Sequence, residues 1–431
     1  MSAVPQPARH YRHWLVFGSL AAGLAAGALL PAHGGPFVTA TANVIEAVGT
    51  LWLNALRMTV GPLVFAMLVS AIAGVSDALA TGRLATRAAF WFAALLMLSG
   101  VLASAISLGL LSLWPVDPDV ASAFVNGAAR GSEVAAAASN WREGIIALLP
   151  PNIIAAAADN AILAVVIFAL LFGFATTRLP VAQRSALTSF FGAMAEAMVV
   201  IVHWVLLAAP VGVFALALGV GRQAGIRAAG LLLQYVTFVS LVIIGGSLVV
   251  YLFVGLRSKT TTRHFAAAIG PVQVVAASTQ SSLATLPVMI ECARERLAIA
   301  PRIAHLVLPL AVAVFRYTSP LGNLAVCFFV AALYGVQPGP LQIVAAVFVA
   351  FAISIGSVGL PGQVSYLASV APICLALGLP VEVLGILVAV EVVPDIFRTI
   401  GNVTADLAVT SILAKDDLVD DVSDSVRKPM S

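Results

Sequence analysis

The chain has 431 residues, of which 61% are hydrophobic and 10% are charged, with a formal net charge of +3 and a mean hydropathy of +1.05. So few charged residues exclude a water-soluble globular protein, whose exterior needs many more of them. Apolar runs of membrane-spanning length recur from end to end of the chain. The sequence therefore predicts an all-α protein that crosses a membrane several times.

Eight apolar stretches are long enough to span a bilayer. They are 14–31, 48–74, 88–114, 150–175, 193–220, 228–255, 304–333 and 381–413. Two further apolar segments, 264–300 and 340–378, are interrupted at STQSSLATLP and SIGSVGLPG. Pro and Gly at these tips release backbone groups that lipid cannot satisfy. We expect two re-entrant helical hairpins that enter from opposite sides as inverted repeats, with two kinked spans as the alternative.

The basic residues set the expected orientation. Most Lys and Arg residues fall on one side if both termini are cytoplasmic, as in a multi-pass protein of a bacterial-type inner (plasma) membrane. Residues 115–149 would then form an external loop rich in small residues. Residues 414–431 would form an acidic cytoplasmic tail, solvated and disordered.

The last span contains an unusually polar stretch, EVVPDIFRTIGNVTADL, at residues 391–407. On a helix that advances about 100° per residue, its polar side chains share one face. Those side chains belong to Glu391, Asp395, Arg398, Thr399, Asn402 and Asp406. Each ionisable group costs about 3 kcal/mol in the middle of a bilayer, so this face must point into the protein.

Two interpretations explain a buried charged face. One is a ladder of ion pairs in which Glu391 and Asp395 flank Arg398, but buried pairs add little net stability and Asp406 has no partner in it. The other is a binding site, because an arginine fork binds a carboxylate and an aspartate one turn away binds an ammonium group. We prefer the second interpretation. It predicts a zwitterionic substrate with an additional acidic group.

Several stretches together carry a family resemblance. They are RMTVGPLVFAMLVSAIAGVSD in the second span, LLPPNIIAAAADNAILAVVIFALLFGFA in the fourth, APVGVFALAL in the fifth, the two hairpin tips and DIFRTIGNVTADL. In these stretches, and over nearly its whole length, the chain resembles the dicarboxylate/amino acid:cation symporters, which include the glutamate and aspartate transporters.

The resemblance implies a glutamate-transporter-like elevator fold in a homotrimer. A scaffold would comprise residues 1–87, with the first two spans, and 150–227, with the fourth and fifth. A mobile transport domain would comprise the third span, 88–114, and residues 228–413, with the other three spans and both hairpins. The outer hairpin tip would act as a gate.

The resemblance also implies roles for individual residues. Arg398 would hold the side-chain carboxylate of the substrate and Asp395 its ammonium group, while Thr399 and Asn402 would position the main carboxylate. Further contacts would come from Ser281, Ser282, Ser319, Leu360, Pro361 and Gly362. For Ser282, a hydroxyl that only caps its own helix is the alternative. Members for neutral substrates lack this arginine and members for plain dicarboxylates lack this aspartate, so the pair favours aspartate or glutamate.

The chain departs from the family at FRYTS, residues 315–319, where sodium-coupled members have Asn-Met-Asp-Gly-Thr. The amide and carboxylate that help to build the sodium sites are missing, and a hard cation needs several oxygen ligands. We expect Arg316 to pair with Asp406 and replace sodium. No metal site is predicted, apart from Asp406 if sodium does bind. Glu391 or Asp395 could carry a coupling proton.

The sequence thus predicts a secondary active transporter of aspartate or glutamate without the usual sodium coupling, either proton-coupled or uncoupled. It predicts no cofactor besides a coupling cation, H⁺ or Na⁺. The expected partners are the amino acid, the bilayer and two further copies of the chain, without nucleic acid. A C4-dicarboxylate symporter, an anion channel and a substrate-binding sensor derived from a carrier are the alternatives. The sequence contains no nucleophile turn, zinc motif or phosphate loop, so it does not predict an enzyme.

Overall fold

The computed structural model describes residues 8–30, 36–79, 83–128, 149–159, 161–356 and 362–427. Every regular element in these ranges is an α-helix, in agreement with the predicted class. In chain order they are α1 (Ala8–Leu29), α2 (Pro36–Leu79), α3 (Arg83–Leu113), α4 (Pro118–Ala128), α6 (Ile153–Ala158), α7 (Ile162–Thr176), α8 (Val181–Leu207), α9 (Ala209–Ala224), α10 (Arg227–Arg257), α11 (Thr262–Thr279), α12 (Ser282–Glu295), α13 (Pro301–Val314), α14 (Thr318–Leu333), α15 (Pro340–Gly356), α16 (Gly362–Ala376), α17 (Leu384–Leu387) and α18 (Val392–Arg427).

Five helices in the described part of the chain are long and apolar enough to cross a membrane, judged by length and composition. They are Ala40–Ile72, Arg83–Leu113, Val181–Leu207, Arg227–Arg257 and the stretch Pro301–Leu333, which comprises α13 and α14. The predicted spans 14–31 and 150–175 contain shorter apolar helices, Leu15–Leu29 and Ile162–Thr176. Several apolar spans are therefore present, and the number eight stays a prediction.

The predicted span 193–220 is divided between two helices. Helix α8 ends at Leu207, and α9 begins at Ala209 with Pro210 in its first turn. Proline lacks an N–H group and its ring clashes with the carbonyl four residues earlier, so α8 cannot continue through it. The predicted span 150–175 is divided as well, because the short helix α6 precedes α7.

The last two predicted spans are interrupted next to the polar residues. Residues 315–317 separate α13 from α14, so the FRYTS stretch lies at a break between two helices. The predicted span 381–413 begins with only the short helix α17, and α18 starts at Val392. The N–H of Asp395 donates to the carbonyl of Glu391 at 2.9 Å, so Glu391 stands one helical turn before Asp395.

Two predictions for the chain between and after the spans are wrong in part. The external loop predicted at 115–149 contains α4, which starts at Pro118 and is capped by Asp117, whose Oδ1 accepts from the N–H of Asp119 at 2.9 Å. The tail predicted to be disordered at 414–431 is helical through Arg427. No glycine or proline interrupts the tail before Pro429, so nothing in its sequence ends α18 earlier.

Two pairs of consecutive helices that pack on each other lie where the hairpins were predicted. Helices α11 and α12 pack on each other and are joined by two residues, Gln280 and Ser281. Gln280 adopts a left-handed conformation with φ of 48°, and the Ser281 hydroxyl caps α12 by accepting from the N–H of Ala284 at 3.2 Å. Helices α15 and α16 also pack on each other, and the residues between them, 357–361, lie outside the described residues.

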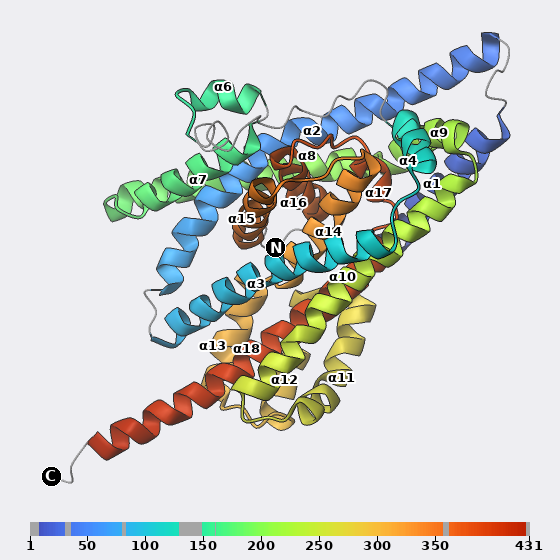
Figure 1. Cartoon of the computed structure of the whole chain (residues 1–431). Helices are drawn as coiled ribbons and strands as arrows, with labels where there is room; N and C mark the ends of the chain where they lie inside the picture. The colour runs from blue at the N-terminus through green and yellow to red at the C-terminus, as the bar shows by residue number, and fades with distance from the viewer. Residues whose placement is uncertain are drawn as a thin grey trace.

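The helices pack in two groups (Figure 1). Helices α1, α2, α4, α7, α8 and α9 contact mainly one another, whereas α3, α10–α14 and α18 form a second group. Helices α15 and α16 lie between them, because they contact α14 in the second group and α2 in the first. Arg57 of α2 also forms an ion pair with the buried Glu382, in the segment between α16 and α17. This pair joins the first group to the segment that leads into α18.

Glycines allow α1 to approach the backbone of α9. A Cβ atom on Gly23 would lie 2.5 Å from the carbonyl oxygen of Phe214, and one on Gly27 would lie 2.8 Å from the backbone nitrogen of Arg222. Small residues at such positions let apolar helices associate through close backbone packing in lipid. The G-x-x-x-G spacing of these glycines puts both on the face of α1 that contacts α9.

We predict that Gly27→Ala destabilises the protein by about 1–3 kcal/mol, because the new methyl group has no space between the two helix backbones. Thermal unfolding of the purified protein in detergent measures the effect. Gly18→Ala is the matched control on the same helix, since nothing lies within 4 Å of its Cβ position. Equal unfolding temperatures for the two variants would contradict close packing of α1 on α9.

Candidate binding site

The polar face of α18 points into the protein. Helix α18 contacts α3 and α10–α14, and the side chains of this face are largely withdrawn from the surface. The exposed fraction is 4% for Glu391, 5% for Thr399, 9% for Asn402 and 0% for Asp406. The prediction that the charged face is directed inward is therefore confirmed for these residues.

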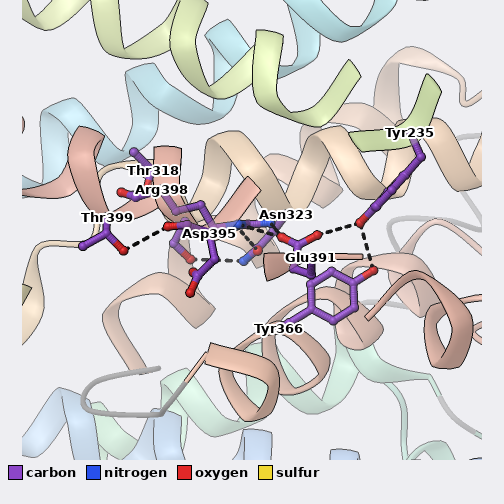
Figure 2. Close-up of polar contacts among 9 residues, drawn as sticks. Tyr235, Thr318, Asn323, Tyr366, Glu391, Asp395, Arg398 and Thr399 are labelled. Atoms are coloured by element: carbon purple, nitrogen blue, oxygen red, sulfur yellow. Dashed lines mark hydrogen bonds and ion pairs between the residues drawn. The ribbon is translucent and has the colours of Figure 1, made fainter. Parts of the chain in front are cut away.

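Arg398 is held by two partners (Figure 2). Its Nε donates to Oε1 of Glu391 at 2.9 Å, and one of its terminal nitrogens donates to Oδ1 of Asn323 on α14 at 2.9 Å. The other terminal nitrogen lies 2.7 Å from the same Glu391 oxygen but is not aligned to donate a hydrogen bond to it. This nitrogen is therefore ion-paired with Glu391 and enclosed by the protein, but it donates no aligned hydrogen bond.

Unlike Glu391, the Asp395 carboxylate accepts no hydrogen bond and forms no ion pair within 4 Å in the described part of the chain, although Arg398 and Arg316 both attract it electrostatically. Figure 2 shows Arg398 directed toward Glu391 and Asn323, with no contact drawn to the Asp395 carboxylate. The ion-pair ladder considered from the sequence is therefore only half formed. An unpaired carboxylate beside a buried guanidinium can bind an ammonium group.

Two tyrosines complete the surroundings of Glu391. The hydroxyl of Tyr235 on α10 donates to Oε2 of Glu391 at 2.8 Å, and it lies 3.2 Å from the hydroxyl of Tyr366 on α16. Both tyrosines are buried. Helices that are far apart in the sequence thus meet at one carboxylate. The sequence interpretation missed both residues, although a buried tyrosine hydroxyl usually needs a partner.

Asn402 and Thr318 tie α18 to the start of α14. Oδ1 of Asn402 accepts from both the N–H and the hydroxyl of Thr318, each at 2.9 Å. Thr318 is the first residue of α14, so Asn402 satisfies a backbone donor that the helix itself leaves unpaired. In this structure Asn402 therefore holds the break between α13 and α14 in place. The Thr399 hydroxyl donates to the carbonyl of Asp395 at 2.9 Å.

Some of the predicted serines and tip residues lie near the polar face of α18. Ser319 accepts from Asn323 at 3.1 Å, so it belongs to the network around Arg398. The turn that contains Ser281 and precedes Ser282 contacts the beginning of α18, since the Gln280 amide reaches the carbonyl of Val392 at 3.5 Å. Gly362 is the first residue of α16. The predicted tip residues Leu360 and Pro361 lie outside the described residues.

The residues at the FRYTS break make apolar or structural contacts. Phe315 stacks on Phe92 of α3, with ring centroids 4.7 Å apart and planes at 12°. The Tyr317 hydroxyl donates to the carbonyl of Gly246 at 2.8 Å. Both side chains are buried. They fill the positions where the family resemblance would place an amide and a carboxylate for sodium.

Arg316 and Asp406 do not make the direct contact that the sequence predicted. Arg316 donates to the hydroxyl of Ser365 at 3.2 Å, while neither oxygen of the fully buried Asp406 accepts a hydrogen bond. Arg316 is still near enough to attract Asp406 electrostatically. Arg316 thus lies near Asp406 without pairing with it. No group of three or more His, Cys, Asp or Glu residues in the described ranges could hold a metal ion.

Comparison with known proteins places this chain among transport proteins. A family model described as the sodium:dicarboxylate symporter family matches residues 13–416. The chain is 27% identical over 404 residues to the proton/glutamate-aspartate symporter of Escherichia coli (strain K12), with 93% of this chain and 92% of that protein covered. It is 28% identical over 428 residues to the neutral amino acid transporter B(0) of Homo sapiens, with 90% and 77% covered. The proton/glutamate-aspartate symporter of Bacillus subtilis (strain 168) is 27% identical over 404 residues, with 91% and 92% covered.

We predict that Tyr235→Phe destabilises the protein by about 1.5–3 kcal/mol, because the buried Glu391 carboxylate loses a hydrogen-bond donor. Chemical or thermal unfolding in detergent measures the loss. Tyr334→Phe is the matched control, since the buried Tyr334 hydroxyl has no hydrogen-bond partner. Removal of the Tyr334 hydroxyl should leave stability unchanged or raise it. Equal losses in both variants would contradict the role of Tyr235 at Glu391.

Proposed function

Because the chain belongs to the sodium:dicarboxylate symporter family, we propose that it is a secondary active transporter of aspartate and glutamate. Family membership confirms the resemblance predicted from the sequence, and the family and the relatives named above are transporters, not enzymes. The apolar helices and these relatives support a multi-pass membrane protein. The observation that carries the proposal is the juxtaposition of Arg398, one terminal nitrogen of which donates no hydrogen bond to the protein, with the Asp395 carboxylate, which it attracts electrostatically.

The proposed binding mode uses both ends of an acidic amino acid. The side-chain carboxylate accepts from the terminal nitrogen of Arg398 that donates to no protein group. The ammonium group binds Asp395. Thr399, Asn402 and the serines at the tip of α11 and α12 position the main carboxylate, together with backbone amides of both tips. Arg398 and Asp395 together select a substrate that has both a carboxylate and an ammonium group. A substrate that lacks one of these groups would leave Arg398 or Asp395 without a partner and out of contact with water.

A C4-dicarboxylate is the second candidate substrate within the same site. Arg398 would bind one of its carboxylates equally well, but Asp395 would then face the other carboxylate and repel it. The partner-free carboxylate of Asp395 therefore favours an amino acid. The relatives named for proton/glutamate-aspartate symport support the same choice.

We further propose that aspartate binding does not require sodium. Phe315 and Tyr317 provide a ring stack and a structural hydrogen bond where a sodium site would need oxygen ligands. Arg316 supplies a fixed positive charge near Asp406 in place of a bound cation. The family implies a coupling cation, H⁺ or Na⁺. Of the two, we propose a proton, carried by Glu391, because Asp395 has to stay ionised to bind the ammonium group.

We also propose the elevator mechanism and the domain division stated above. The first packing group, with α1, α2, α7, α8 and α9, would be the trimeric scaffold, and the second group, with α18 and the α11–α12 pair, would move with the substrate. The separate packing of these groups supports the division. Both termini would be cytoplasmic in an inner membrane, as the distribution of basic residues favours.

We predict that Arg398→Ala lowers the affinity for aspartate at least about 100-fold, because the charge-assisted contact to the side-chain carboxylate of the substrate is lost. Counterflow of radiolabelled aspartate in proteoliposomes measures transport, and it separates a carrier, which exchanges substrate, from an anion channel. Calorimetry measures binding, and it detects a sensor that binds without transport. Arg178→Ala, an exposed arginine at the end of α7, is the control and should leave both unchanged. Normal aspartate binding by the Arg398 variant would refute the proposed site.

A second prediction concerns the coupling ion. The dissociation constant for aspartate should differ by less than roughly twofold between sodium-free and sodium-rich buffer, because the oxygen ligands of the sodium sites are missing. Uptake into vesicles should respond to an imposed proton gradient and not to a sodium gradient. A steep dependence of binding on sodium would contradict the role assigned to Phe315, Arg316 and Tyr317.

A further inference from the structure

Gly322 on α14 leaves space that the end of Arg398 occupies. A Cβ atom built on Gly322 would lie 2.2 Å from Cζ of Arg398, 2.2 Å from one terminal nitrogen and 2.6 Å from the other. The guanidinium plane therefore rests directly against the backbone of α14. No side chain larger than hydrogen fits at position 322 while Arg398 keeps this position.

The neighbours of Gly322 fix the guanidinium at this depth. Asn323, the next residue along α14, accepts from one terminal nitrogen, and Glu391 accepts from Nε. The Asn323 amide is itself oriented by its hydrogen bond to Ser319. Asn323 therefore holds the guanidinium against α14, and the position of the guanidinium depends on the absence of a side chain at residue 322.

We propose that Gly322 determines the length of the acidic side chain that the site accepts, an inference that rests on the proposed function. The ammonium group is held at Asp395 and the distal carboxylate at Arg398, so the depth of the guanidinium sets the distance between the two charged ends. A methyl group at position 322 moves the guanidinium away from α14 by about 1 Å or more to reach ordinary contact distance. This shift is comparable to the one methylene by which glutamate exceeds aspartate.

The test is Gly322→Ala, assayed by calorimetry with L-aspartate and L-glutamate on the purified full-length protein. The variant should fold, because the atoms that meet the new methyl group belong to the end of a flexible side chain and alanine favours a helix. We expect glutamate affinity to fall relative to aspartate affinity by about tenfold, the usual effect of one methylene in a fitted pocket. Gly230→Ala on α10, where nothing lies within 4 Å of the Cβ position, should leave the ratio unchanged.

The wild-type protein provides a second measurement that does not depend on the variant. With Arg398 drawn back against α14, glutamate should bind at least as tightly as aspartate. A preference for aspartate of roughly tenfold or more would overturn the proposal. So would an unchanged ratio in Gly322→Ala, or an equal loss of both affinities. If the wild type binds neither amino acid, the proposed function fails as well, whereas normal binding with an unchanged ratio refutes only the role of Gly322.

Discussion

The contact between Arg398 and Glu391 is the interaction on which the rest of the site depends. Removing two charges from water costs several kcal/mol for each ion, and only good geometry with further hydrogen bonds compensates for it. Tyr235 and Asn323 provide those bonds from α10 and α14. Gly322 provides the room for the guanidinium. Helices from distant parts of the sequence thus meet at one ion pair and supply its hydrogen bonds.

Backbone N–H groups at the breaks between helices also need hydrogen-bond partners. Where α14 starts, its first N–H group has no helical partner, and Asn402 of α18 accepts from it. Where α12 starts, Ser281 accepts from the N–H of Ala284. The polar residues of the site therefore do two things: they satisfy exposed backbone at the helix breaks, and they leave selected donors and acceptors unused. Under the function proposed above, a charged substrate completes those groups.

Sequence periodicity was sufficient to predict the buried face of α18, because residues three and four apart on a helix must share a side. It also predicted the two interrupted apolar segments, because proline and glycine mark the turns. It could not predict the contributions of Tyr235, Asn323 and Gly322, which depend on how α10 and α14 pack against α18. The direct pair of Arg316 with Asp406 was wrong for the same reason: charge complementarity is visible in a sequence, but the distance between two helices is not. Pro210, which divides α8 from α9, was visible but was included in one long apolar run.

The ion pair of Arg57 with Glu382 has a consequence for the speed of any motion. Arg57 has 37% of its side chain exposed, whereas Glu382 has only 11%, and one of its oxygens already lacks a hydrogen bond. If α2 and the segment before α17 slide past each other, this ion pair has to open, and the mostly buried Glu382 carboxylate loses its arginine. A buried carboxylate without its partner is costly, so this ion pair opposes relative movement of the helices that it joins.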